Sequence, residues 1–210
     1  MNRRLYTIYK KLYCYFGPQN WWPADSPFEV MLGAILTQNT NWHNVERAIH
    51  NLKKEKLLSV SKLAKVSQGK LACLIKPTGY YNIKAKRLNS FLKFFLKNYQ
   101  GSIKKISSEH TPQLRRKLLS VNGIGQETAD SILLYALNKP VFVIDAYTKR
   151  IFYRHHFIDG NAEYENIQAL FMQHLKKNNK LFNEYHALLV RLGKEFCLKN
   201  NPRCSICPLK

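Results

Sequence analysis

Acidic residues are scarce in this chain. Of its 210 residues 13 are Asp or Glu, against 34 Lys or Arg, so that the formal net charge is +21 at pH 7. No run of about 18 apolar residues is present, which is the length that a membrane-spanning helix needs. The basic N-terminus also lacks the apolar core of a signal peptide. These absences predict a cytoplasmic protein with no membrane association.

The basic residues recur along the whole sequence. They form short groups at 53–54, 84–87, 115–117 and 176–177, and no charged tail or low-complexity linker separates them. This spread favours a folded basic surface over a disordered arm. Such a surface is typical of a protein that binds nucleic acid, with affinity that falls steeply as salt rises. A Lys-rich solvated surface with no such partner is the alternative.

Apolar spacing predicts an all-α fold. Residues 28–36 form an apolar run after a Pro-rich entry, and Val45, Ala48, Ile49 and Leu52 follow the i, i+3, i+4, i+7 pattern of an amphipathic helix. Residues 88–96 repeat this pattern before Gly101, and 181–192 form a further helix. Only the run V-F-V-I at 141–144 resembles a strand, and four residues are too few to assign one. No internal repeat is present.

The sequence V-N-G-I-G-Q at 121–126 predicts a tight hairpin between two helices. Apolar positions repeat at helical spacing on both sides of Gly123, Ile124 and Gly125. Glycines allow positive φ and a close approach of the backbone to a ligand. The N–H groups at the start of the second helix would then offer a phosphate site. The flanking periodicity and the net charge favour DNA binding over an ordinary packing corner.

A single carboxylate, Asp145, follows the apolar run 141–144 and precedes another helical pattern. Its simplest role is an N-cap that accepts N–H bonds from the following turn. Catalysis is compatible with that role, because a carboxylate that is held in place is available to a bound substrate.

These segments together resemble the helix-hairpin-helix DNA glycosylase superfamily. The resemblance rests on L-L-S-V-N-G-I-G-Q-E-T-A-D-S-I-L with the following V-I-D-A-Y-T-K-R-I, on L-G-A-I-L-T-Q-N-T upstream, and on the cysteines near the end. It covers nearly the whole chain and is strongest for endonuclease III-like proteins. The motifs W-W-P and L-T-Q-N-T are similar to those of bacterial 3-methyladenine DNA glycosylases.

The resemblance implies two helical lobes with a central cleft. The corresponding ranges are about 27–140 for the lobe with the hairpin, 1–26 with 141–196 for the second lobe, and 197–210 for a cysteine-containing loop. The expected partner is double-stranded DNA that carries a damaged base, and the expected state is a monomer. The damaged nucleotide would be flipped out of the stack.

The resemblance also implies roles for single residues. Asp145 would activate water or stabilise the cationic sugar as the base leaves. Gly123, Ile124 and Gly125 would grip the DNA backbone, and Gln38 would enter the stack near the vacated position. Gln38 as a plain polar residue at a helix end is the alternative.

Glu127 is a departure from the family pattern. Members that also cleave the strand have a Lys there, whose amine attacks the sugar. A Glu cannot form that Schiff base, so we expect base release without efficient lyase activity.

Aromatic residues indicate the substrate. All three tryptophans, with Pro23, lie near the motifs L-T-Q-N-T and W-W-P, and relatives that act on alkyladenine hold the flipped base between aromatics matching Trp21 and Trp42. Trp22 and Pro23 complete the expected pocket. Indole faces attract a cation such as 3-methyladenine. Core packing of the tryptophans, an oxidised or deaminated pyrimidine substrate, and a DNA-binding relative without catalysis are the alternatives.

Three cysteines have the spacing of an iron–sulfur loop. Cys197, Cys204 and Cys207 correspond to the first three ligands of the endonuclease III-like 4Fe-4S cluster, and the expected fourth Cys is absent from this chain. Cys14 and Cys73 have no motif that supports them as substitutes. A 4Fe-4S cluster is the expectation, either in a shortened chain or with a ligand other than Cys. Zinc and a relic loop without metal are the alternatives.

One other group of polar residues receives a structural interpretation. Glu184, Tyr185 and His186 are expected on a polar helix face, not in a second active site.

Overall fold

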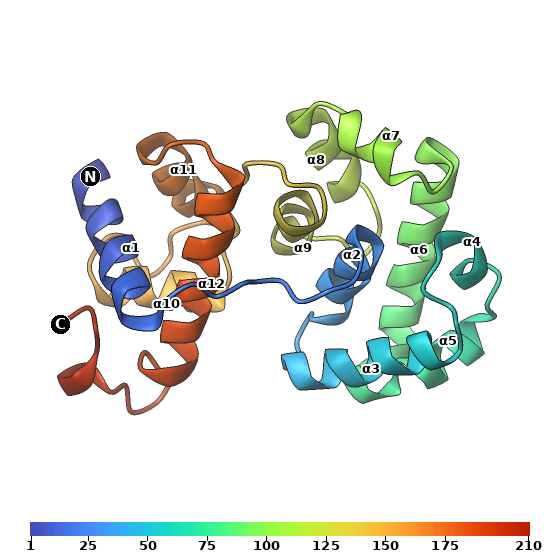
Figure 1. The fold of residues 1–210 in the computed structure, drawn as a ribbon, viewed down its shortest axis with the longest axis horizontal. Coiled ribbons are helices and arrows are strands. Elements are labelled where there is room, and N and C mark those ends of the chain that lie inside the picture. The colour runs from blue at the N-terminus through green and yellow to red at the C-terminus, as the bar shows by residue number, and fades with distance from the viewer. The chain divides into compact units, whose positions relative to one another are not determined.

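The computed structural model describes all 210 residues and contains twelve α-helices and no β-strand (Figure 1). The prediction of an all-α fold is therefore confirmed. None of these helices is both long and apolar enough to cross a membrane. The chain forms two compact units, one made of residues 1–23 with 138–210 and the other of residues 24–137.

The unit 24–137 is organised around α2 (Pro27–Leu36). Every residue of α2 from Phe28 to Leu36 is buried, as its apolar run predicts. Its neighbours are α3, α6, α9 and a π-helical turn at Ile132–Ala136. The helices of this unit after α2 are α3 (Trp42–Lys54), α4 (Val60–Leu63), α5 (Gln68–Leu74), α6 (Tyr81–Tyr99), α7 (Ile103–Ser108), α8 (Thr111–Leu119) and α9 (Gln126–Ser131).

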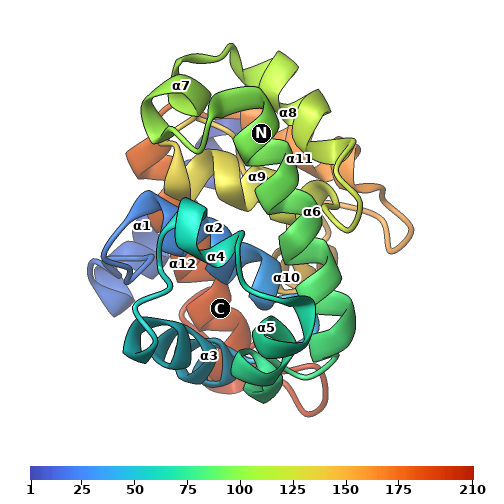
Figure 2. The same cartoon turned by 90° about the vertical axis from the view of Figure 1, so that its right-hand side faces the viewer.

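Two of the predicted apolar faces form part of this core. Val45, Ala48, Ile49 and Leu52 of α3 are all buried, at the helical spacing that the sequence shows. The long helix α6 ends at Tyr99, with Gln100 and Gly101 in left-handed conformations directly after it. Figures 1 and 2 both show α5 lying against α6. The expected end of this helix near Gly101 is confirmed.

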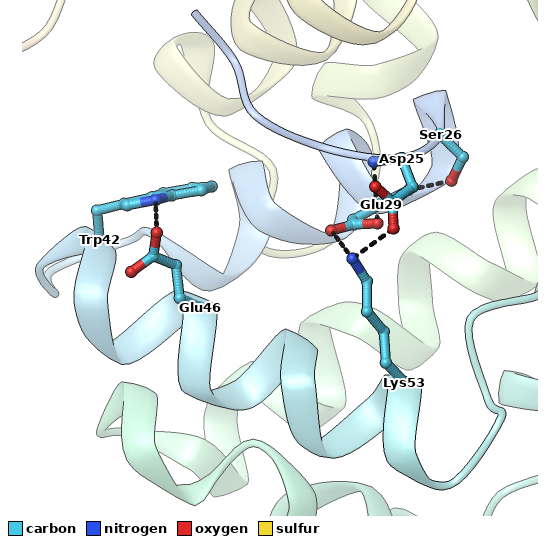
Figure 3. A network of polar contacts seen from close by, with 6 residues as sticks. All are labelled: Asp25, Ser26, Glu29, Trp42, Glu46 and Lys53. Atoms are coloured by element: carbon cyan, nitrogen blue, oxygen red, sulfur yellow. Dashed lines mark hydrogen bonds and ion pairs between the residues drawn. The ribbon is translucent and has the colours of Figure 1, made fainter.

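A polar network fixes the start of α2 (Figure 3). Ser26 caps the helix by accepting a hydrogen bond from the Glu29 N–H, and the Glu29 carboxylate accepts one from the Asp25 N–H. The Lys53 ammonium, near the end of α3, lies 2.7 Å from Asp25 Oδ2 and 2.9 Å from Glu29 Oε1. The Lys53 ammonium, which both carboxylates share, ties the start of α2 to the end of α3. The segment that follows Pro23 is thereby anchored to this unit.

A buried cation fixes the other end of α2. Lys84 of α6 is 1% exposed, and its ammonium donates hydrogen bonds to the Leu36 carbonyl at 2.9 Å and to the Thr78 carbonyl at 2.7 Å. Burial, with a smaller effect of Arg87, lowers the pKa of Lys84 to about 8. Because two carbonyls accept N–H groups of this buried amine, Lys84 has a structural role in holding the chain just before Gln38.

The unit 1–23 with 138–210 is built on α12 (Asn179–Glu195), which packs against α1 (Asn2–Phe16) and α10 (Ala146–Arg154). A further helix, α11 (Tyr164–His174), contacts α1. The apolar run 141–144 is buried and belongs to no helix or strand. Its Phe142 ring stacks on Phe171 of α11 with centroids 3.8 Å apart. This segment therefore serves as core and leads directly to Asp145.

Candidate functional site

The hairpin lies between α8 and α9, where the sequence places it. Val121 and Ile124 are buried and anchor the turn, which the Ile124 N–H closes onto the Val121 carbonyl at 3.0 Å. Gly123 has φ +86, whereas Gly125 is extended at φ −89 and caps α9. The positive φ expected of the glycines thus belongs to Gly123. No atom lies within 4 Å of the place of a Cβ at Gly125, so the surroundings of this residue at the start of α9 are open.

A buried ion pair joins the two helices of the hairpin. Arg115 of α8 donates from Nε to Asp130 Oδ1 at 2.7 Å and from Nη2 to Oδ2 at 2.9 Å. Asp130 of α9 is fully buried. This two-point geometry fixes direction as well as distance. The angle between α8 and α9, and with it the shape of the turn, depends on this pair.

Gln38 lies against the hairpin. Its Nε2 donates to the Gly123 carbonyl and to Thr128 Oγ1, both at 2.9 Å, and Arg87 donates to its Oε1. The side chain is half-buried. Entry of this side chain into a DNA stack would require these hydrogen bonds to break.

Gly123 is the position of the hairpin where a side chain is least tolerated. A Cβ there would lie 2.2 Å from Arg87 Cγ and 2.7 Å from Cδ, so Gly123→Ala would displace the arginine that holds Gln38. A left-handed conformation costs Ala about 1–2 kcal/mol and overpacking about 1–3 kcal/mol. We therefore expect Gly123→Ala to lower the unfolding free energy of this unit by about 2–4 kcal/mol, measured by urea denaturation, and to weaken DNA binding.

Gly125→Ala is the matched control for that prediction. Its extended backbone and open surroundings predict a change in unfolding free energy within about 0.5 kcal/mol. If Gly123→Ala and Gly125→Ala lowered the unfolding free energy equally, the loss would not come from the left-handed conformation of Gly123.

Asp145 caps α10, as its position before a helical pattern predicts. Its Oδ1 accepts a hydrogen bond from the Thr148 N–H at 2.7 Å. The side chain is 11% exposed, so the carboxylate is nearly enclosed while a small part reaches the surface. The buried run 141–144 on one side and α10 on the other fix its backbone. The Asp145 carboxylate is therefore held in one orientation before a ligand binds.

His186 is a residue of this site that the sequence analysis missed. Its Nε2 lies 3.6 Å from Asp145 Oδ2, and the residue is 5% exposed. The expectation of a polar helix face is wrong for His186 and for Tyr185, which is fully buried and donates a hydrogen bond to the Leu5 carbonyl. Packing of α12 against both α1 and α10 covers these side chains. The sequence did contain a signal for this burial: Phe182 and Leu189, four residues before and three after His186, are apolar and lie on the same helix face.

The tryptophans are all half-buried. Trp21 and Trp22 belong to the first unit, where their ring centroids are 5.8 Å apart and the Lys194 ammonium lies 5.8 Å from the Trp21 ring. Trp42 belongs to the other unit and is the first residue of α3. Its indole Nε1 donates to Glu46 Oε1 at 2.7 Å, which fixes the ring (Figure 3). Pro23 is exposed.

The cysteine loop does not form a metal site in this structure. Burial raises the pKa of Cys207, and the neighbouring thiols Cys197 and Cys204 raise it further, so the three lie within electrostatic reach. Cys197 is buried and its Sγ accepts a hydrogen bond from Arg154, whereas Cys204 is exposed. No group of three side chains is placed to hold a metal ion. The residues present therefore do not fit a four-thiolate cluster.

Glu127 lies in the first turn of α9 and is exposed. Its carboxylate is well placed to interact with the positive end of the helix dipole. The first turn of α9 therefore carries an acid, and not an amine, at this position.

Known sequences resemble this chain along nearly its whole length. Residues 32–177 match the family described as HhH-GPD superfamily base excision DNA repair protein. A Methanocaldococcus jannaschii protein named as a DNA repair glycosylase is 51% identical over 207 residues, which cover 98% of this chain and 94% of that protein. The endonuclease III of Thermotoga maritima is 29% identical over 195 residues, which cover 92% of this chain and 84% of that enzyme.

Solved structures show the same fold. The H. pylori 3-methyladenine DNA glycosylase bound to 1,N6-ethenoadenine has a TM-score of 0.78 at 31% identity, covering 91% of this chain and 97% of that one. A non-covalent endonuclease III–DNA complex has a TM-score of 0.85 at 20% identity, covering 100% of this chain and 93% of that one. At that identity the second likeness concerns the fold alone.

Proposed function

Because the chain belongs to the HhH-GPD superfamily of base excision DNA repair proteins and is a DNA glycosylase, we propose that it releases an alkylated purine such as 3-methyladenine from double-stranded DNA. The proposed reaction is hydrolysis of the N-glycosidic bond by a monomer in the cytoplasm, without a lyase step. The observation that carries the chemistry is the fixed, nearly enclosed carboxylate of Asp145.

Asp145 suits the cleavage of a glycosidic bond. As the base departs, positive charge develops on the sugar, and a preorganised carboxylate stabilises that charge. The same group can take a proton from the water that attacks the sugar. The Thr148 N–H occupies Oδ1 at 2.7 Å and so holds the carboxylate before the substrate arrives. The target nucleotide must be flipped to reach it, because the bond is inaccessible in a duplex.

The hairpin supports the DNA-binding part of this proposal. Gly123 and Ile124 shape the turn, and Gly125 has open surroundings at the start of α9, where backbone N–H groups and the helix dipole favour a phosphate. Such contacts position DNA without reading its sequence. With a net charge of +21, binding is expected to weaken strongly as salt rises.

Aromatic residues support the choice of an alkylated purine. The carboxylate of Glu46 accepts the indole N–H of Trp42, which makes that ring richer in electrons and a better partner for a cationic base. Lys194 already places a cation near the Trp21 ring, which makes Trp21 the weaker cation partner of the two. The 31% identity to a 3-methyladenine DNA glycosylase points in the same direction.

The test is a base-release assay on duplexes that carry N3-alkylated adenine, an oxidised pyrimidine or a deaminated pyrimidine. We expect release of the alkylated purine. In Trp42→Leu the rate of this release should fall by about 2- to 30-fold, which corresponds to the loss of one cation–π contact. Tyr13→Leu, which removes an exposed aromatic of α1, is the matched control and should leave the rate unchanged. Preferred release of a pyrimidine would instead support the endonuclease III-like alternative.

The same preparation tests the absence of a lyase step. Borohydride should trap no covalent adduct with an abasic duplex, because Glu127 has no amine to form a Schiff base. A trapped adduct would overturn the monofunctional proposal while leaving base release intact.

A further inference from the structure

His186 is a buried imidazole directly beside the proposed catalytic carboxylate. It comes from α12, whereas Asp145 caps α10, and these helices pack against each other. Asp145 has one oxygen, Oδ1, bound by the Thr148 N–H, and the other, Oδ2, lies 3.6 Å from His186 Nε2. The two side chains are 7% and 11% exposed, so water screens their interaction little. The carboxylate therefore has a backbone donor at one oxygen and an imidazole at the other.

The cations of α10 and the carboxylate before His186 on α12 have partners of their own. On α10, Lys149 donates to the Ala162 carbonyl, Arg150 to the Cys197 and Gly193 carbonyls, and Arg154 to the Leu198 and Lys199 carbonyls. Glu184 of α12 accepts a hydrogen bond from the Gln19 N–H. Burial lowers the pKa of His186, and the charge of Asp145 opposes this effect.

We propose that His186 is a positioning residue for Asp145, whose neutral imidazole holds the carboxylate for catalysis and whose protonation switches it off. The proposal rests on the proposed function of Asp145. In the neutral state, the tautomer with its proton on Nε2 points a donor at Oδ2. The 3.6 Å separation of Nε2 from Oδ2 is longer than a hydrogen bond in this structure, and the proposal requires it to shorten in the DNA complex, as catalytic hydrogen bonds often do.

Protonation of His186 would change the electrostatics of the site. An imidazolium beside Oδ2 compensates the negative charge that Asp145 would otherwise offer to the developing sugar cation. Activity should therefore fall as the pH falls through the pKa of His186. Burial lowers the pKa of His186 below its ordinary value of 6.5, against an opposing effect of Asp145, so the imidazole is neutral at pH 7.

The first test is the pH profile of single-turnover base release. In the wild type we expect an acidic limb below pH 6.5. His186→Gln keeps a donor but cannot titrate, so this limb should disappear. His186→Phe removes the donor and should lower the rate at neutral pH by about 10- to 100-fold, the effect of a misplaced catalytic group, with DNA affinity unchanged. Tyr185→Phe, the neighbouring buried residue, is the structural control and should keep the wild-type limb.

The second test needs no catalysis and uses the reciprocity of linked titrations. Because Asp145 raises the pKa of His186, replacing it by Asn should lower the pKa of His186 further, measured from the imidazole proton resonances. An unchanged His186 pKa in Asp145→Asn, or an acidic limb that persists in His186→Gln, would overturn the inference. Base release that survives in Asp145→Asn would instead overturn the catalytic role of Asp145 in the proposed function. If His186→Phe does not fold, the pH profile of His186→Gln and the His186 pKa in Asp145→Asn still test the proposal.

Discussion

Asp145→Asn is expected to abolish nearly all base release, with a fall of about 10²- to 10⁴-fold in the single-turnover rate at neutral pH. The amide is neutral and can neither stabilise a sugar cation nor accept a proton from water. It can still accept the Thr148 N–H bond, because Asn is as good an N-cap as Asp. The fold and the DNA dissociation constant should therefore be preserved, which single-turnover kinetics and a binding titration on the same duplex would measure.

Asp159→Asn is the matched control, since Asp159 is an exposed carboxylate of the same unit. It should leave the rate within about twofold, an effect typical of surface charge. If Asp145→Asn kept wild-type base release, the carboxylate would be only a helix cap, and the reaction would depend on another group. If the wild type itself bound DNA without releasing any base, the chain would be a non-catalytic relative.

Arg115→Met is expected to give the largest loss of stability. It leaves Asp130, which is fully buried, without its two-point partner. Breaking a buried pair from one side costs about 3–5 kcal/mol, because a charge remains in a medium that solvates it poorly. For a protein of this size that corresponds to a fall of roughly 6–20 °C in the Tm, measured by thermal unfolding.

Two further variants separate the ion pair from other effects. Arg116→Met changes the exposed neighbouring residue of α8 and should shift the Tm by about 2 °C or less. The double variant Arg115→Met with Asp130→Leu removes both charges and should recover part of the loss. A single variant as stable as the wild type would show that the pair does not fix α8 against α9.

Local features of the chain were predictable because their causes lie within a few residues. The apolar spacing in α2, α3 and α6 requires only that one helix face be buried, and the structure buries those faces. The N-cap role of Asp145 depends on the Thr148 N–H three residues away. The turn at Gly123 depends on a backbone that a residue with a Cβ rarely adopts. Each of these predictions rests on short-range interactions.

Contacts between distant segments could not be read in the same way. Gln38 lies beside Gly123 because α2 and α9 pack together. Its amide therefore donates a hydrogen bond to the hairpin, a contact that the sequence had not predicted. Because Tyr185 and His186 are polar residue types, the sequence predicted a solvated face for them. In the structure, α1 and α10 pack against α12 and bury both side chains. The three cysteines have the spacing of a ligand loop without the geometry of a metal site.

The sequence by itself determined the all-α fold, the hairpin with its glycines, the capping carboxylate Asp145 and the acid at Glu127. Helical periodicity, turn conformation and caps are set by neighbouring residues, so one sequence suffices for them. Only the tertiary structure decided that His186 lies beside Asp145, that Arg115 meets Asp130, and that Gln38 is bound to the turn. These pairs depend on which helix faces pack against each other, a choice made by the whole core and not by any one segment.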